Sequence, residues 1–159
     1  NDNKILYCSN LGDSKAILVR TMENEKGNIE TKEIVSITDE HKCSNEKEAE
    51  RIKSLGGIVF NGRLFGQLAL SRCLGDFNLK PYGLTINPSF VKMEVYEGDY
   101  IIAASDGVWD VVSEDNVKDL IIEEISNGGN ADTIGKKINK ISLEKESNDN
   151  ISCIVIKIW

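Results

Sequence analysis

The apolar segment Tyr100 to Ala104 constrains this chain most, because it predicts a buried strand that ends on the acidic turn Ser105-Asp106-Gly107. A second carboxylate, Asp110, follows four positions after Asp106, beside a tryptophan. Ionised carboxylates at the end of a core strand cost roughly several kcal/mol unless cations or hydrogen-bond donors meet them. The protein must therefore provide a partner for these acids or bind one.

The remaining segments indicate an α+β fold built on antiparallel sheets, with helices packed on the sheets. The predicted strands span residues 4–10, 15–20, 34–37, 58–60, 63–72, 90–95, 100–104 and 151–159. The predicted helices begin at residues 44 or 45, 113 and about 132. We expect strands 4–10 and 15–20 to form a hairpin, and residues 21–33 and 73–88 to be loops. Strand 151–159 is nearly all apolar, which is typical of a strand deep in a sheet stack.

Length and charge exclude several classes of protein. A chain of 159 residues is long enough for one domain, or part of one, so we treat 1–159 as a single partial domain. The net charge of −7 argues against a nucleic-acid binder, and no apolar run is long enough for a membrane helix. The start, NDNKILYCSN, has no initiator methionine and suggests a processed chain or a fragment.

The four cysteines lie far apart and form no C-x-x-C pair. They favour reduced thiols in an intracellular protein, cytoplasmic or nuclear, over disulfides or a zinc site.

Four aspartates occupy the same kind of position, a tight polar turn beside an apolar strand: Asp13, Asp106, Asp110 and Asp149. Turns at strand ends converge when sheets stack, and oxygen-only ligands from several loops suit Mg²⁺ or Mn²⁺. Aspartate is also a turn former, and taken alone Asp13 and Asp149 favour that role. Asp106 follows a buried segment directly, which leaves a metal or catalytic role as open as a structural one.

Other candidate groups point to structural roles. The single histidine, His41, favours a surface or structural position over general acid or ligand, and Trp109 favours core packing between the two acids. Arg63 and Arg72 flank a strand and favour solvation or ion pairs over anion binding. The chain contains no EF-hand, no glycine-rich phosphate loop and no serine hydrolase elbow. The sequence therefore names no catalytic residue besides the metal ligands.

Five segments in chain order resemble the metal-dependent serine/threonine protein phosphatases of type 2C. They are NLGDSKA at 10–16, DEHK at 39–42 with the helix that follows, LALSRCLGD at 68–76, ASDGVWDV at 104–111 and SNDNIS at 147–152. The resemblance implies two stacked antiparallel sheets flanked by helices, a phosphoprotein substrate, and hydrolysis by a metal-bridging water. It implies that Asp106 and Asp149 hold the catalytic metals, and that Asp13 and Asp110 hold a neighbouring metal that shares Asp106.

The family's Asp-Gly-His-Gly-Gly motif and its upstream arginine have no counterpart here. The chain is therefore expected to be the C-terminal portion of a catalytic domain that is inactive alone. The alternative is a non-catalytic regulatory or docking module that uses the same half of the fold. Unpaired sheet edges would also favour self-association of the isolated chain.

Overall fold

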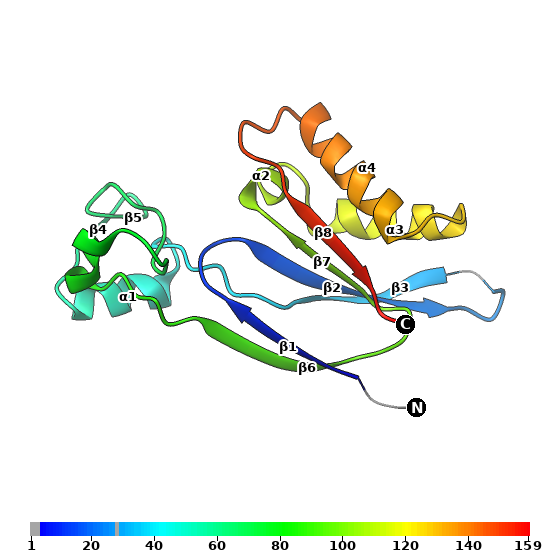
Figure 1. Ribbon diagram of the computed structural model, residues 1–159, viewed down its shortest axis with the longest axis horizontal. Helices are drawn as coiled ribbons and strands as arrows, with labels where there is room; N and C mark the ends of the chain where they lie inside the picture. The colour runs from blue at the N-terminus through cyan, green and yellow to red at the C-terminus, as the bar shows by residue number, and fades with distance from the viewer. Residues whose placement is uncertain (1–3, 28) are drawn as a thin grey trace. The chain divides into compact units, whose positions relative to one another are not determined.

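The computed structural model describes residues 4–27 and 29–159 and divides into two compact units. The sheet unit comprises residues up to 7, residues 15–37 and residues 91–159. The small unit comprises residues 8–14 and 38–90. Figure 1 labels the helices and strands of both units.

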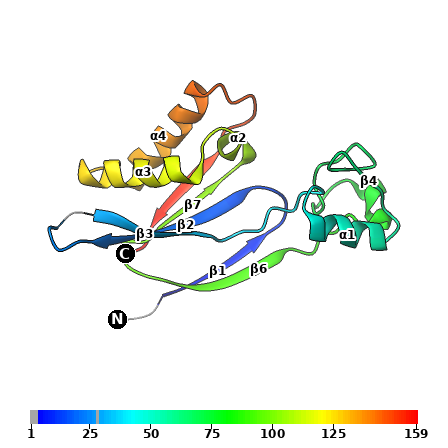
Figure 2. The same cartoon turned by 180° about the vertical axis from the view of Figure 1, so that it is seen from behind.

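The sheet unit is built on a four-stranded antiparallel sheet with the strand order β3-β2-β7-β8. Its strands are β2 (Lys15–Glu23), β3 (Ile29–Ser36), β7 (Tyr100–Ala104) and β8 (Cys153–Lys157). A second sheet pairs β1 (Lys4–Asn10) with β6 (Ser89–Val95). Figures 1 and 2 show the parts of β1 and β6 that belong to this unit on the opposite side of the four-stranded sheet from the helices.

Three helices complete the sheet unit: α2 (Asp106–Trp109), α3 (Glu114–Ser126) and α4 (Ala131–Glu144). Ser113 caps α3 and Asn130 caps α4, as short polar side chains do at helix starts. Apolar residues of α3 and α4 form one core cluster with residues of the sheet. Its fully buried members are Ile17, Val19, Ile102, Val108, Val117, Ile121, Ile134 and Ile138. Each such side chain contributes about 1.5–3 kcal/mol by leaving water.

The predicted hairpin between strands 4–10 and 15–20 is wrong. β2 is paired on both edges, with β3 and with β7, whereas β1 pairs with β6 in the other sheet. The expected loop 21–33 is also too long, because β2 and β3 extend into it and pair as far as Glu23 and Ile29. Residues 11–14 instead connect strands of two different sheets.

The expectation that strand 151–159 lies deep in a sheet stack is wrong for this structure. Within the described part of the chain, β8 has β7 as its one neighbouring strand. Cys153 and Val155 pack against the core cluster, while Ile154 and Ile156 are 63% and 47% exposed. The strand is apolar on both faces, but only the face toward the helices is covered.

The small unit contains α1 (Glu46–Ser54), the two-residue strands β4 (Val59–Phe60) and β5 (Arg63–Leu64), and the 3₁₀ helix η1 (Phe77–Tyr82). The predicted cap Asn45 accepts a hydrogen bond from the Lys47 amide at 3.0 Å. The adjacent strands expected at 58–60 and 63–72 do pair, through a turn at Asn61 and Gly62 with positive φ at both residues, although the second strand is shorter than expected. η1 lies within the expected loop 73–88.

A small core holds the small unit together, formed by Cys43, Ile52, Leu64 and Leu84. None of the helices in the described ranges of either unit has the length and apolar character that a bilayer span requires.

Candidate functional site

The end of β7 delivers Asp106 to the first position of α2. Ser105 is extended, with φ −74° and ψ 168°, and precedes the helical turn that begins at Asp106. The Asp110 amide donates to the Asp106 carbonyl at 2.8 Å, so the two residues are one helical turn apart. Side chains separated by four residues lie on the same helix face. The helical turn, absent from the sequence expectation, therefore explains the spacing of these two acids.

Asp149 lies in the turn before β8, and two serine hydroxyls join this turn to the end of β7. The Ser147 hydroxyl donates to the Gly107 carbonyl at 2.6 Å, and the Ser105 hydroxyl donates to the Asn150 carbonyl at 2.9 Å. The Ser152 amide in turn donates to the Ser105 hydroxyl at 3.2 Å. Residues 40 to 47 positions apart are thus fixed side by side.

Gly107 permits this close approach. A Cβ atom at Gly107 would lie 2.4 Å from the Asn150 carbonyl oxygen and 3.3 Å from the Asp149 carbonyl carbon. No side chain fits that space, so only glycine lets the residue after Asp106 touch the turn of Asp149. The two turns are consequently closer than any other residue at position 107 would allow.

Trp109 is fixed beside the same strand end, partly as expected. Its ring packs against the core cluster, and its indole Nε1 donates to the Lys15 carbonyl at 3.0 Å. The Lys15 ammonium lies 5.5 Å from the ring centroid and forms an ion pair with Glu114. The first residue of β2 therefore anchors the side chain between the two acids of α2.

Asp106, Asp110 and Asp149 form no ion pair with any side chain in the described residues. Asp106 and Asp149 each accept a hydrogen bond from the next backbone amide, that of Gly107 at 2.9 Å and that of Asn150 at 2.6 Å. Among residues 4–27 and 29–159, no three acidic, histidine or cysteine side chains are grouped as a metal would require. Carboxylate oxygens are ligands that a hard cation prefers, but the described residues place no third such side chain with Asp106 and Asp149.

The fourth predicted ligand, Asp13, belongs to the small unit. The backbone beside it is fixed by His41, which is only 2% exposed: the Gly12 amide donates to His41 Nδ1 at 3.2 Å, and the His41 amide donates to the Gly12 carbonyl at 2.9 Å. Burial, together with nearby Arg72, lowers the pKa of His41, which favours the neutral ring that this hydrogen bond needs. The structural role predicted for His41 is confirmed.

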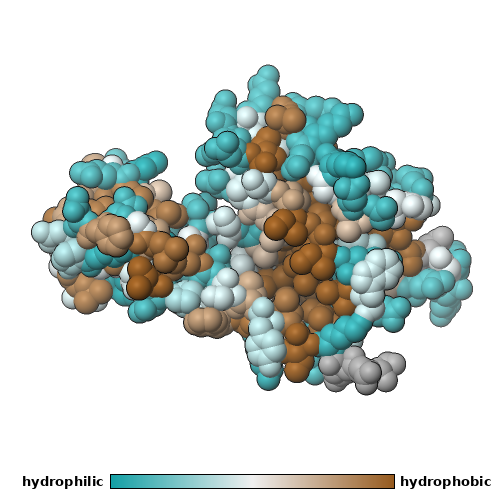
Figure 3. Space-filling model, in the orientation of Figure 1, coloured by the Kyte–Doolittle hydropathy of each residue, from teal (hydrophilic) through white to brown (hydrophobic). Residues whose placement is uncertain are grey.

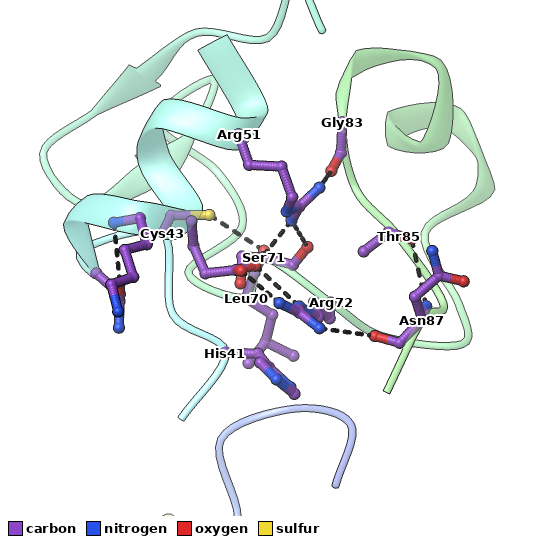
Figure 4. Close-up of polar contacts among 12 residues, drawn as sticks. His41, Cys43, Arg51, Leu70, Ser71, Arg72, Gly83, Thr85 and Asn87 are labelled. Carbon is purple, nitrogen blue, oxygen red and sulfur yellow. Dashed lines mark hydrogen bonds and ion pairs between the residues drawn. The ribbon is translucent and has the colours of Figure 1, made fainter. Parts of the chain in front are cut away.

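The small unit also contains a charged network that sequence reasoning missed (Figure 4). Glu48 of α1 is 6% exposed, and its carboxylate accepts two hydrogen bonds from Arg72, at 2.6 and 3.0 Å, and one from Arg51, at 2.8 Å. Although burial alone would raise the pKa of Glu48, these hydrogen bonds hold it well below its usual range. The salt-bridged state predicted for Arg72 is confirmed. The sequence signal that could have revealed this network was a glutamate on the buried side of a helix.

Solved structures share this fold over nearly the whole chain. A phosphatase from a pathogenic strain of Toxoplasma gondii superposes with a TM-score of 0.78 and 25% identity, covering 95% of this chain and 47% of that one. A C. elegans sex determining protein superposes with a TM-score of 0.76 and 29% identity, covering 97% and 37%. The antiparallel sheets with flanking helices therefore define an α+β fold of the type 2C phosphatase class.

The sequence gives the same result. Residues 1–151 match the family described as Protein phosphatase 2C, and the chain belongs to this family. Probable protein phosphatase 2C 28 of Arabidopsis thaliana is 35% identical over 98% of this chain, and Protein phosphatase 1B of Bos taurus is 31% identical over 96%. The chain spans less than half the length of these curated relatives, 43% of the first and 31% of the second.

Proposed function

We propose that this chain forms part of a metal-dependent phosphatase that hydrolyses phosphoserine and phosphothreonine in proteins. Family membership supports the reaction class and a phosphoprotein substrate. The observation that carries the assignment to these residues is the joining of the Asp106 and Asp149 turns by two serine hydroxyls. Two aspartate turns joined in this way, with no ion pair to either carboxylate among the described residues, are suited to bind a cation from solution.

The cofactor proposed is Mg²⁺ or Mn²⁺, with Asp106 and Asp149 as ligands and with Asp13 and Asp110 as ligands of a neighbouring ion. When bound, such ions activate water and offset charge on the phosphoryl oxygens. The chain's own contribution is preorganisation. Ser105 and Ser147 fix the spacing of the two turns, so the backbone that carries the two aspartates is already in place before a cation binds.

The direct test begins by determining the coding sequence upstream of Asn1 and expressing the whole product. We expect Mn²⁺-dependent hydrolysis of a phosphothreonine peptide that falls more than about 100-fold in Asp106→Asn and Asp149→Asn. Asp132→Asn, on the exposed start of α4, is the matched control and should keep full activity. A folded product without turnover would instead favour the non-catalytic module.

The purified 159-residue chain has a different expected result, because it lacks the family's Asp-Gly-His-Gly-Gly motif and its upstream arginine. It should hydrolyse the same peptide no faster than buffer with Mn²⁺ alone. Robust turnover by the isolated chain would refute this part of the proposal.

The isolated chain should also self-associate through the free edge of β8. Figure 3 shows apolar surface over the strands of the sheet unit. Ile154 and Ile156 of β8 are both exposed apolar side chains. Light scattering should give a mass above the monomer, and Ile156→Lys should reduce it. Leu143→Lys, which changes an exposed apolar residue of α4, is the control. A stable monomeric wild type would contradict this expectation.

A further inference from the structure

A cavity of about 440 Å³ in the small unit is lined by three basic side chains and, within the described chain, by no acidic one. Arg51 comes from α1, Lys80 from η1, and Arg72 from the segment between β5 and η1. Figure 4 shows Thr85 and Asn87 beside the two guanidinium groups. This positive cavity is unusual for a chain whose net charge is −7.

The two arginines are already held in place. Glu48 binds both guanidinium groups, and Arg51 additionally donates to the carbonyls of Gly83, at 2.6 Å, and Ser71, at 3.0 Å. Long basic side chains normally lose rotamer entropy when they bind a ligand, at a cost of about 0.5–1.5 kcal/mol each. Because these contacts already hold both arginine side chains, much of this rotamer entropy is lost on folding and not on ligand binding.

Hydrogen-bond donors remain at the cavity wall after these contacts. Arg51 Nη1 donates to the Gly83 carbonyl, and Arg72 Nη1 donates to the Asn87 carbonyl at 3.0 Å; both acceptor residues line the cavity. Each Nη1 carries two hydrogens, so each has one left. The Lys80 ammonium donates to the Cys73 carbonyl and has two more hydrogens.

The cavity keeps a net positive charge after the arginines pair with Glu48. Glu48 offsets one of the three positive charges, which leaves two. A phosphoryl group near neutral pH carries about 1.5 to 2 negative charges and three acceptor oxygens, whereas a carboxylate carries one charge. The cavity, of about 440 Å³, has room for a phosphate group with part of its hydration shell.

We propose that this cavity is a phosphoryl-binding site formed by Arg51, Arg72 and Lys80. Its ligand is a phosphate group, either free or carried on a protein side chain. The site lies wholly within the small unit and uses none of the proposed metal ligands. The inference therefore stands apart from the proposed phosphatase activity.

The test is a titration of the purified 159-residue chain with inorganic phosphate in EDTA, at constant ionic strength set with chloride, followed by calorimetry. EDTA removes divalent cations, so the aspartates have no means of holding the anion. We expect saturable binding that Lys80→Gln weakens about three- to tenfold, as loss of a partly exposed charge-assisted hydrogen bond does. Lys53→Gln, an equal change of charge on exposed α1, should bind like the wild type.

A second variant keeps the test informative if Lys80→Gln fails to fold. Asn87→Asp places a negative charge at the cavity wall and leaves the backbone contacts of Asn87 intact. It should also weaken phosphate binding, whereas Asn78→Asp, outside the cavity lining, should not. Absence of phosphate binding above chloride, or equal affinities for all four variants, would overturn the proposal.

Peptide binding distinguishes a phosphate group carried on a protein from free phosphate. A phosphoserine peptide that binds more tightly than inorganic phosphate, and whose unphosphorylated form does not bind, supports a protein ligand. Tighter binding of inorganic phosphate supports a free anion. Equal binding of both peptide forms, together with no response to Lys80→Gln, would contradict the site.

Discussion

Glu48 of the small unit and Asp106 of the sheet unit are both acids placed against apolar structure, and their surroundings differ. Glu48 has two arginines on its carboxylate. Asp106 and Asp149 have backbone amides and, in the described part of the chain, no cationic side chain. The first acid is neutralised within the protein, whereas the second pair has the surroundings that the proposed ligand role requires. An acid's partner thus distinguishes a stabilising role from a ligand role.

Among the substitutions that test this comparison, we expect the largest loss of stability for a change of Glu48. Glu48→Gln leaves two guanidinium groups without their shared carboxylate, and we expect a loss of about 2–4 kcal/mol in the free energy of unfolding. Urea denaturation followed by circular dichroism measures it. Glu46→Gln, on the exposed side of the same helix, is the control. A loss no larger than that of Glu46→Gln would show that the network contributes little.

The same carboxylate should give the small unit an acid-sensitive stability. The folded-state pKa of Glu48 is lowered, because hydrogen bonds from the arginines outweigh the effect of burial. Its contribution is therefore complete above the unfolded-state pKa of about 4.3 and is lost as pH falls below that value. Melting temperatures between pH 7 and pH 3 should fall more steeply for wild type than for Glu48→Gln. Parallel curves would contradict the assignment.

In the sheet unit, Gly107→Ala should have the next largest effect. The new Cβ would lie 2.4 Å from the Asn150 carbonyl oxygen and force the two aspartate turns apart. Overpacking of this kind costs about 1–3 kcal/mol. Gly75→Ala, where no atom lies within 4 Å of the new Cβ, is the control. Equal thermal stability of the two variants would show that the turns can separate freely.

Ser147→Ala should have the smallest effect on stability. It removes the hydrogen bond to the Gly107 carbonyl at 2.6 Å, which contributes about 1 kcal/mol. Ser126→Ala removes a comparable bond, to the Ile122 carbonyl at 2.8 Å, on the exposed part of α3. Both variants should lose similar stability, but only Ser147→Ala should speed amide exchange at Gly107 and Asn150. Identical exchange patterns would rule out a positioning role for Ser147.

Local pattern predicted much of the fold. The five apolar residues before Asp106 marked β7, the capping residues Asn45 and Ser113 marked two helix starts, and Asn61-Gly62 marked a hairpin. These features depend on neighbours in sequence. The pairing of β1 with β6, and the position of β8 at a sheet edge, depend on distant strands, which local periodicity does not encode.

The candidate site, too, was predicted only where it depends on local sequence. Asp106 and Asp149 were visible as acids at strand ends, and the structure joins their turns, while their joint action on a metal stays a prediction. The contacts that join them, through Ser105 and Ser147, span 45 and 40 residues and were not visible in sequence. Glu48 was missed because its main partner, Arg72, lies 24 residues away.

The most direct test of the central claim is a titration of the purified chain with Mn²⁺, in which electron paramagnetic resonance reports the free ion. We predict weak saturable binding by wild type that falls more than about tenfold in Asp106→Asn and in Asp149→Asn, since loss of even an outer partner of a metal ligand typically costs about 10- to 100-fold. Asp132→Asn should bind like wild type. Equal binding by wild type and all three variants would show that the joined aspartates hold no cation, and the assignment of this site would be wrong.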